Sequence, residues 1–337
     1  MVFILELQLG VLVTFLLNKM SGVTITGVGG YLPPNVITNR DLSKKYNVTE
    51  EWLYSRSGIN ERHLAHADQY TSDLAFESSK LAIADAGIDA SSIGMIIIAT
   101  STADLAFPST ACILQNKLTI KECIAFDIQA ACTGFIYALS IATKFIENAD
   151  VSSALVVGAE TLSRIQNPDD ISTELLFGDG AGAVILSASP DKKGIISSHI
   201  RSDARYKDLL YATGGISNRG GNIYATMDGP KLFKQAVIRL SETIDETLRI
   251  NNLSKEDIDW LVPHQANRRI IDSMARRYGF DLEHVIITVG SHANTSAATV
   301  PLALYQGVID GKIQRGDLLL FIAFGAGFTW GSALVEY

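Results

Sequence analysis

Cysteine is scarce in this chain, whose 337 residues include only Cys112, Cys123 and Cys132. Three cysteines form no even framework, and none lies in a CxxC motif or a Cys/His cluster. The sequence therefore supports neither a disulfide scaffold nor a structural zinc site. We expect no metal site, and a reducing cytoplasm as the location of the protein.

The chain also has no excess of basic residues, with 28 Lys and Arg against 36 Asp and Glu. The formal net charge at pH 7 is -8, and 19% of the residues are charged. Proteins that bind nucleic acids present a basic face to the phosphates, so composition argues against nucleic acid as a partner. The 47% of hydrophobic residues are enough for one large or two medium folded units.

Two segments resemble a membrane or secretion leader and a dinucleotide-binding loop, but each lacks part of the pattern. The apolar leader at residues 1–19 has no basic start and no clear cleavage site, and it barely reaches the roughly 20 residues that span a bilayer. We interpret it as a segment outside the fold and expect no membrane association; a membrane anchor is the alternative. The segment GVGGYLPP lacks the GxGxxG spacing of a dinucleotide site, and prolines stand where its helix should begin.

An internal repeat is present. Residues 87–100 align without a gap with residues 252–265, so that Ile93 matches Ile258. Each copy follows a periodic helix and runs into a short apolar strand, which indicates a duplicated unit.

The apolar segments of the two halves agree as well. SALVVGAE and LLLFIAF are continuous apolar runs, which indicate strands covered on both faces. GDGAGAVILS and GAGFTWGSALVEY are interpreted as glycine-rich turns that enter a second strand. We predict an α/β fold of two pseudo-symmetric halves, residues 20–190 and 191–337, with sheets between helix layers.

Cys132 lies where IAFDIQAACTGFIYALSIATKFI changes from a strand, through small residues, to a long apolar helix. Unpaired N–H groups and the dipole at a helix start favour a thiolate, so Cys132 is a candidate nucleophile. The alternative is a small buried apolar residue, and this is our interpretation of Cys112 and Cys123.

His264 follows a buried strand in LVPHQANRRI, at the edge where α/β sheets place ligands. A neutral imidazole there can donate a hydrogen bond to an oxyanion or exchange protons; a structural histidine is the alternative. VIITVGSHANTSAATVP predicts a strand, a loop and a helix at the position equivalent to Cys132. Asn294 in this loop either caps the helix or donates its amide to a carbonyl oxygen, with His292 as a competitor.

Together, AACTGF, PHQANRRI, HANTSAA and FGAGFTWGSA resemble the β-ketoacyl-acyl carrier protein synthase III family in order and spacing, from Met20 to the C-terminus. The resemblance implies a thiolase-like fold with α-β-α-β-α layers and a homodimer. Elongating synthases of this superfamily carry Cys-His-His and thiolases Cys-His-Cys, whereas Cys132, His264 and Asn294 fit the initiating type. Type III polyketide synthases share Cys-His-Asn but have a longer C-terminal loop.

The resemblance implies a decarboxylative condensation of a short acyl-CoA, with acetyl-CoA favoured, and malonyl-acyl carrier protein, which initiates type II fatty acid synthesis. Cys132 takes the acyl group, with the N–H groups of Cys132 and Ala326 as the oxyanion hole. His264 and Asn294 stabilise the enolate. CoA thioester is a substrate, and no cofactor is implied.

Further positions match family sites. Trp52 and Arg56 match an aromatic and arginine pair that holds CoA, whereas Ile171 stands where many members have another nucleotide-contacting arginine. Phe107 matches a pocket position supplied by the second subunit and favours small primers.

The acidic carrier protein requires a basic face, and we expect it on helices beside the His264 loop. Lys234 and Arg269 match docking positions of the family, and we expect Arg269 outside the reaction chamber. The full basic set is Lys231, Lys234, Arg268, Arg269, Arg276 and Arg277. The alternative is an ordinary solvated helix face.

Two other functions stay open at this point. One is a specialised condensing or acyl-transferring synthase of secondary metabolism. The other is a cysteine hydrolase of acyl thioesters, which requires an acidic group to orient His264; the HQAN motif offers an amide there.

Overall fold

The structure is a computed structural model that describes residues 22–190, 193–218 and 221–337. The interpretation of residues 1–19 concerns residues outside this part. Within the described ranges, no helix is both long enough and apolar enough to cross a membrane. The same ranges contain no group of three or more His, Cys, Asp or Glu side chains arranged to hold a metal ion.

The first half forms a five-stranded sheet in the order β1-β7-β6-β4-β5. β4 is parallel to both β5 and β6, whereas β7 is antiparallel to β6 and β1. The strands are β1 (Gly22–Tyr31), β4 (Met95–Ala99), β5 (Ile124–Ile128), β6 (Ser153–Thr161) and β7 (Asp179–Ser189).

The second half repeats this pattern in a four-stranded sheet of order β11-β12-β13-β8. β11 and β12 are parallel, and β13 is antiparallel to β12 and β8. A parallel bridge from Leu261 to Val285 stands where the first half has β5. The strands are β8 (Ile195–Ser202), β11 (Trp260–Pro263), β12 (Leu318–Gly325) and β13 (Thr329–Glu336).

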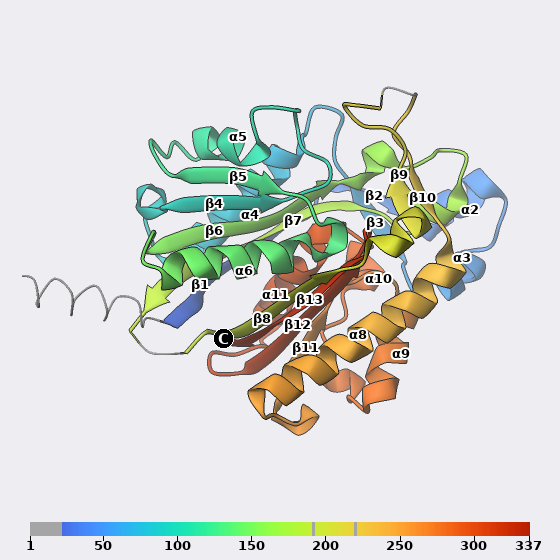
Figure 1. The fold of residues 1–337 in the computed structure, drawn as a ribbon. Coiled ribbons are helices and arrows are strands. Elements are labelled where there is room, and N and C mark those ends of the chain that lie inside the picture. Colours follow the sequence, from blue (N-terminus) through green and yellow to red (C-terminus); the bar gives the residue numbers. More distant parts are fainter. Residues whose placement is uncertain (1–21, 191–192, 219–220) are drawn as a thin grey trace, which may run out of the picture.

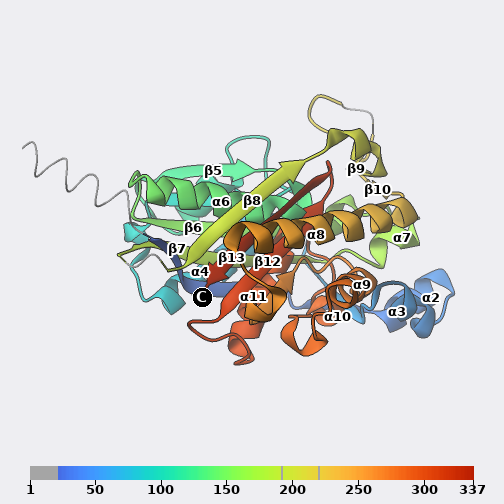
Figure 2. The ribbon, with the colours of Figure 1, turned by 60° about the horizontal axis from the view of Figure 1, so that its bottom comes forward.

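Three helix layers enclose the two sheets, and together they form the predicted α-β-α-β-α arrangement (Figures 1 and 2). One layer covers the outer face of the first sheet, a second lies between the sheets, and a third covers the outer face of the second sheet. In that order, the helices are α4 (Thr71–Ala86) and α5 (Thr110–Lys117), α6 (Gly134–Glu147) and α11 (Thr299–Ile309), and α8 (Gly229–Asn251) and α9 (Arg268–Tyr278).

Shorter elements gather mainly at one end of the sheets, on the right in Figure 1. They are α2 (Asn39–Tyr46), α3 (Glu50–Ser57), α7 (Ile171–Glu174), α10 (Val289–His292), β2 (Asn35–Thr38), β3 (Glu61–Leu64), β9 (Leu210–Ala212) and β10 (Ala225–Met227). The 3-10 turns are η1 (Ala90–Ser92), η2 (Ala131–Thr133), η3 (Leu162–Ile165), η4 (Ala204–Leu209), η5 (Lys255–Asp257), η6 (Leu282–His284) and η7 (Ser296–Ala298).

The sequence repeat coincides with a structural repeat. Gly87 and Asn252 end equivalent helices in the left-handed conformation, with φ of 63° and 53°. Each is followed by a 3-10 turn, η1 or η5, and then by a strand, β4 or β11. The predicted duplication therefore extends to the helix caps.

Two local predictions were wrong. GDGAGAVILS is no turn, because β7 begins at Asp179. A Cβ atom at Gly182 would lie 2.6 Å from the Leu302 nitrogen, so glycine there lets α11 approach the strand. The strand predicted at the start of VIITVGSHANTSAATVP forms only the bridge at Val285. The Gln265 side chain binds the N–H groups of Thr288 and Val289 and the carbonyl of Ile286, in place of a neighbouring strand.

Candidate active site

Cys132 lies in η2, between the end of β5 and the start of α6, and is 7% exposed. Its neighbour Ala131 holds a positive φ of 45°, which turns the chain sharply ahead of the cysteine. The end of β12 packs against this turn, and a Cβ atom at Gly325 would lie 2.8 Å from the Cys132 nitrogen. Only glycine at that position admits so close an approach.

His264 follows β11, where its backbone N–H donates to the Ile322 carbonyl at 2.8 Å. The side chain is buried, and its Nδ1 lies 2.6 Å from the Thr299 hydroxyl. Burial lowers the pKa of His264 to about 3. The imidazole is therefore neutral at physiological pH, as a hydrogen-bond donor to an oxyanion requires.

Asn294 lies between α10 and η7. Its Oδ1 accepts the Ser296 N–H at 2.9 Å. A backbone N–H can only donate, so this contact fixes the amide and leaves Nδ2 for the neighbouring cavity. The side chain thus holds the first N–H of η7, although the N-cap position itself is Thr295, and it remains a potential donor.

One cavity unites these three residues. It has a volume of about 680 Å³, and Cys132, His264 and Asn294 all line it. This volume is in the range of small-molecule sites. His292 is buried, but it is not among the residues that line this cavity.

The Cys132 thiol is protonated at neutral pH. Burial raises the pKa of Cys132 to about 12, whereas a hydrogen bond with Ser296 lowers it. We expected the helix start to favour a thiolate, but regular α6 begins only at Gly134, and desolvation of the buried sulfur dominates. Attack by this sulfur therefore requires a proton acceptor.

The rim of the cavity carries the predicted CoA pair. Trp52 and Arg56 lie one turn apart on α3, with the guanidinium carbon 5.0 Å from the indole centroid. Both line the cavity, and Trp52 is 36% exposed. Ile171, the first residue of α7, lines the same cavity.

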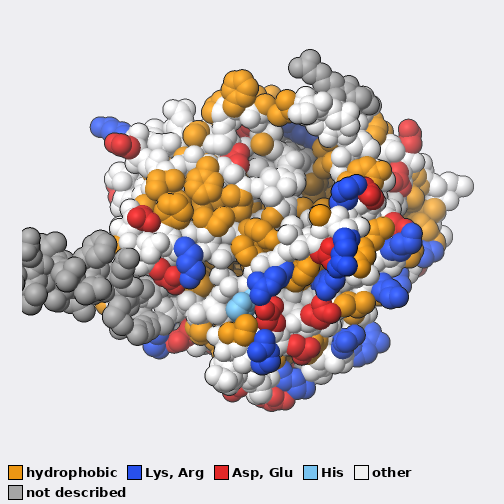
Figure 3. Space-filling view, viewed as in Figure 1, with side chains coloured by type: hydrophobic (Ala, Val, Ile, Leu, Met, Phe, Trp, Pro, Cys, Tyr) orange, Lys and Arg blue, Asp and Glu red, His pale blue; other side chains and the backbone are white. Residues whose placement is uncertain are grey.

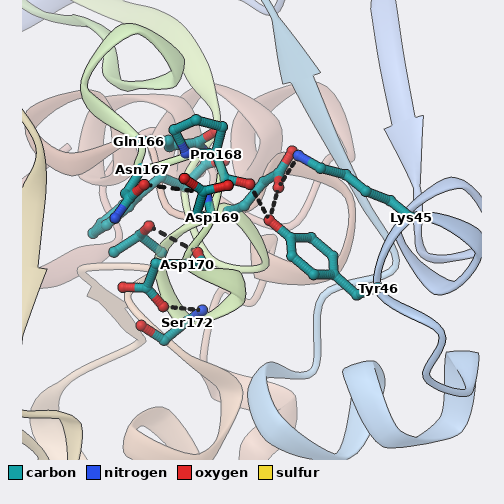
Figure 4. Close-up of polar contacts among 11 residues, drawn as sticks. Lys45, Tyr46, Gln166, Asn167, Pro168, Asp169, Asp170 and Ser172 are labelled. Atoms are coloured by element: carbon teal, nitrogen blue, oxygen red, sulfur yellow. Dashed lines mark hydrogen bonds and ion pairs between the residues drawn. The ribbon is translucent and has the colours of Figure 1, made fainter.

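Polar contacts connect α7 and the loop before it to α2 (Figure 4). Glu174 accepts from Lys45 Nζ at 2.7 Å and also from the Tyr46 hydroxyl. The Tyr46 hydroxyl also lies 3.0 Å from the Pro168 carbonyl, and Asp170 caps α7 through the Ser172 N–H at 2.8 Å. These contacts hold one side of the cavity rim.

The predicted docking residues separate into different environments. Arg269 lines the cavity, with its guanidinium 5.7 Å from the Phe233 ring, so it lies closer to the reaction chamber than we expected. Arg268 forms an ion pair with Asp272 at 2.7 Å. Lys234 lines a separate surface hollow with Lys231 and Arg205. Lys and Arg side chains gather over α8 and α9, with acidic side chains among them (Figure 3).

Besides the docking residues Lys234 and Arg268, the predicted residues Phe107 and Ala326 are not among those that line the cavity. Phe107 is 85% exposed. Ala326 occupies the turn between β12 and β13, next to Gly325, and its carbonyl accepts from the Thr329 hydroxyl at 3.0 Å.

Sequence reasoning missed three buried polar residues behind the predicted ones, namely Thr299, Ser296 and Glu160. Thr299 contacts His264, and Ser296 contacts Cys132 and Glu160. Glu160 offered a signal, because it is a lone carboxylate at the end of the otherwise apolar run SALVVGAE.

The first of two similar halves supplies a cysteine at its strand-to-helix junction, and the second supplies a histidine and an asparagine. This arrangement defines a condensing enzyme of the thiolase fold. The family described as 3-Oxoacyl-[acyl-carrier-protein (ACP)] synthase III matches residues 126–204, and its C-terminal part matches residues 248–337. The chain belongs to the β-ketoacyl-acyl carrier protein synthase III family. It is an acyltransferase of fatty acid biosynthesis.

Individual relatives agree along nearly the whole chain. The β-ketoacyl-[acyl-carrier-protein] synthase III of Thioalkalivibrio sulfidiphilus is 49% identical over 94% of this chain and 100% of its own. The Xanthomonas campestris protein of the same name is 51% identical over 93% and 98%. The crystal structure of 3-oxoacyl-[acyl-carrier-protein] synthase III from Aquifex aeolicus superimposes with a TM-score of 0.89, at 41% identity over 94% and 100% of the chains.

Proposed function

We propose that the enzyme condenses a short acyl-CoA, with acetyl-CoA favoured, with malonyl-acyl carrier protein and so initiates type II fatty acid synthesis. The products are β-ketoacyl-acyl carrier protein, CoA and carbon dioxide. The observation that carries this proposal is the convergence of Cys132, His264 and Asn294 in one cavity. The cytoplasm is the compartment that fits these substrates and three unpaired cysteines.

In the first stage, the Cys132 sulfur attacks the thioester carbonyl carbon of the acyl-CoA. The N–H groups of Cys132 and Ala326 are the proposed donors to the oxyanion, because backbone donors held in place stabilise charge as it develops. The carbonyl re-forms, the bond to the CoA sulfur breaks, and CoA leaves. The acyl group remains on Cys132 as a thioester.

In the second stage, malonyl-acyl carrier protein places its thioester carbonyl against His264 and the Nδ2 of Asn294. Loss of carbon dioxide leaves an enolate, which these two neutral donors stabilise. Its carbon attacks the acyl-Cys132 carbonyl, and the sulfur of Cys132 is released. A buried cavity with positioned donors favours this step because it holds the two reacting carbons together and limits water.

The alternative of a thioester hydrolase has less support from the site. A triad-like hydrolase requires an acidic side chain that orients the histidine. His264 instead contacts the Thr299 hydroxyl. No observation favours a specialised secondary-metabolic synthase over the initiating enzyme.

The rim and the basic face fit the two substrates. Trp52 and Arg56 offer an aromatic face and a guanidinium to the CoA nucleotide, and Ile171 leaves this subsite with an apolar wall. Arg269, together with Lys234 and Arg268, is the proposed contact for the acidic carrier protein. Arg269 also lines the cavity, which supports a contact with the arm that enters from the carrier.

A homodimer is the proposed assembly. β5 is the edge strand of the first sheet, and Ile124 on it is 38% exposed. A broad apolar patch covers the part of the first sheet that carries β5 and the adjoining α6 (Figure 3). Exposed apolar patches with an unpaired strand edge favour association. Phe107, at 85% exposure, is then available to the cavity of the second subunit, where it would limit primer length.

Mass spectrometry of the intact protein after incubation with acetyl-CoA tests the first stage. We expect one acetyl group, which peptide mapping assigns to Cys132. Acetylation of Cys112 or Cys123 with Cys132 unmodified would overturn the assignment. A panel of longer acyl-CoA substrates then measures the primer preference.

A further inference from the structure

Arg62 is a buried charge that the reaction described so far does not use. It lies on β3 and is 1% exposed. Within the described residues it forms no ion pair, and its Nε has no hydrogen-bond partner. Burial lowers the pKa of Arg62 to about 10, so the guanidinium is still charged at neutral pH. A buried charge without a counterion is unfavourable for folding alone.

The guanidinium of Arg62 joins two segments that are distant in the sequence. Nη1 donates to Asn39 Oδ1 at 2.9 Å, and Nη2 donates to the Leu175 carbonyl at 2.7 Å. Asn39 is the first residue of α2, and its Nδ2 donates to the Ile59 carbonyl at 2.7 Å. Because a guanidinium is planar and rigid, it fixes both acceptors relative to one another. The Leu175 carbonyl is thereby anchored to the start of α2.

Residues 175–178, which we call the brace, hold the backbone of Asn294. The Asn294 N–H donates to the Leu176 carbonyl at 2.9 Å, and the Gly178 N–H donates to the Asn294 carbonyl at 3.1 Å. Phe177 and Asn294 form a parallel bridge. Both backbone polar groups of Asn294 are therefore bound by the brace.

The brace is packed between Arg62 and the residue before Asn294. A Cβ atom at Gly178 would lie 3.4 Å from the Cβ of Arg62 and 3.3 Å from the Cβ of Ala293. Ala293 holds a positive φ of 56°, a conformation that a residue other than glycine keeps only where its surroundings impose it. Release of the brace would therefore let the backbone at Ala293 relax and shift Asn294.

We propose that Arg62 is a positioning residue for malonyl decarboxylation, which holds the Asn294 amide in the cavity by fixing the brace. The guanidinium fixes the Leu175 carbonyl, and the brace fixes the backbone of Asn294, so that Nδ2 can face the substrate. This inference rests on the proposed role of Asn294 in stabilising the enolate. Acyl transfer to Cys132 uses other groups, and the backbone hydrogen bonds of the brace do not involve them.

Three substitutions separate this role from a general effect on the fold. Arg62→Met has a side chain of similar length without donors, and it relieves the desolvation cost of the buried charge. Arg62→Lys keeps the charge and a donor for the Leu175 carbonyl. Arg315→Met is the matched control, because Arg315 also donates to backbone carbonyls, those of Ile25 and Thr26 on β1, but does not line the cavity.

The first measurement compares the two stages of the reaction at saturating substrate. Release of carbon dioxide from malonyl-acyl carrier protein reports the second stage, and single-turnover acetylation of Cys132 reports the first. Misplacement of a group by about 1 Å can slow a step by about 10²-fold. For Arg62→Met we expect decarboxylation to be about 10-fold slower and acetylation to stay within about 2-fold of the wild type. Arg62→Lys should fall between Arg62→Met and the wild type, and Arg315→Met should keep both rates.

The second measurement follows the brace without the reaction. Hydrogen exchange of the Gly178 and Asn294 amides, read by mass spectrometry of the peptides that contain them, reports local opening. Exchange at these amides should be faster in Arg62→Met than in the wild type and in Arg315→Met. Peptides from β12 should exchange alike in all three proteins.

Wild-type decarboxylation by folded Arg62→Met would refute the proposal, and the proposed function would then stand. Equal losses in both stages would reduce Arg62 to a general support of the fold, and a selective loss without faster exchange would exclude a route through the brace. If the wild type itself does not decarboxylate, the proposed function fails, and hydrogen exchange still decides whether Arg62 holds the brace. Where Arg62→Met does not fold, as judged by circular dichroism, Asn39→Ala removes the acceptor of Nη1 and should show the same selective loss.

Discussion

The contact between His264 and Thr299 predicts which nitrogen of the imidazole carries the proton. The Thr299 hydroxyl lies 2.6 Å from His264 Nδ1 and 2.9 Å from the Ser296 carbonyl. It has one proton and two possible acceptors. Enolate stabilisation requires that Thr299 donate to Nδ1, because only then does Nε2 carry the N–H that can face the substrate. Thr299→Val, which has nearly the same shape, should therefore slow decarboxylation.

The expected loss of decarboxylation rate in Thr299→Val has a lower and an upper bound. Removing one orienting hydrogen bond is worth about 0.5–1.5 kcal/mol, or roughly 2- to 12-fold. Removing a whole oxyanion donor, as in His264→Ala, is worth about 3–4 kcal/mol, or roughly 10²- to 10³-fold. The loss of decarboxylation rate in Thr299→Val should fall between these limits, at about 10-fold. Thr299→Ser, which keeps the hydroxyl, should stay close to the wild type.

The assay follows release of carbon dioxide from malonyl-acyl carrier protein, beside single-turnover acetylation of Cys132 on the same preparations. Only the first rate should fall in Thr299→Val, because His264 acts in the second stage. A folded Thr299→Val enzyme with the wild-type decarboxylation rate would refute the proposed tautomer. Equal losses in Thr299→Val and Thr299→Ser would assign the effect to packing.

Three further outcomes are expected. Asn294→Ala should lose decarboxylation by about 10²- to 10³-fold while acetylation of Cys132 stays measurable; full condensation activity would reduce Asn294 to a cap of η7. Arg269→Glu should slow the reaction with malonyl-acyl carrier protein more than acyl transfer from acyl-CoA, and the gap should shrink with added salt. Lys80→Glu, exposed on α4 and outside the basic face, is its control, and equal effects would remove the specific role of Arg269. The folded His264 has a pKa of about 3, below its ordinary 6.5, so the unfolded chain binds the proton more tightly between these values. The free energy of unfolding should accordingly rise with pH over this window, and His264→Ala should reduce the slope by up to about 1.4 kcal/mol per pH unit.

The architecture was largely predictable from the sequence because the same order of helices and strands occurs in both halves of the chain. Apolar strands at equivalent places in both halves predicted two covered sheets, strand ends predicted where Cys132 and His264 would lie, and the repeat predicted that Asn294 would lie at the junction equivalent to that of Cys132. Chemistry concentrates at strand ends in α/β folds, so three separated segments could be assigned to one site. Their distances to one another required the fold.

Side chains that replace backbone partners could not be predicted. Residues 285–288 are apolar enough for a strand, but Gln265, distant in the sequence, takes their backbone hydrogen bonds. The pKa of Cys132 was missed for a related reason. A helix start favours a thiolate locally, but burial by residues from the second half raises the pKa of Cys132. The sequence around Cys132 does not indicate that burial.

The duplication also explains how one site acquires several functional groups from two similar junctions. Ala131 in η2 and Ser296 in η7 occupy equivalent positions, and both hold a positive φ, 45° and 50°. Each junction packs against a glycine of a strand in the opposite half: Gly325 meets Cys132, and Gly158 meets Ala297. The repeat thus brings two like turns face to face across the centre of the molecule. The two turns differ in chemistry, because the first presents the thiol while the second presents Ser296 and Asn294. This pairing of equivalent turns places different side chains beside one another, and substitution within one copy supplies the difference.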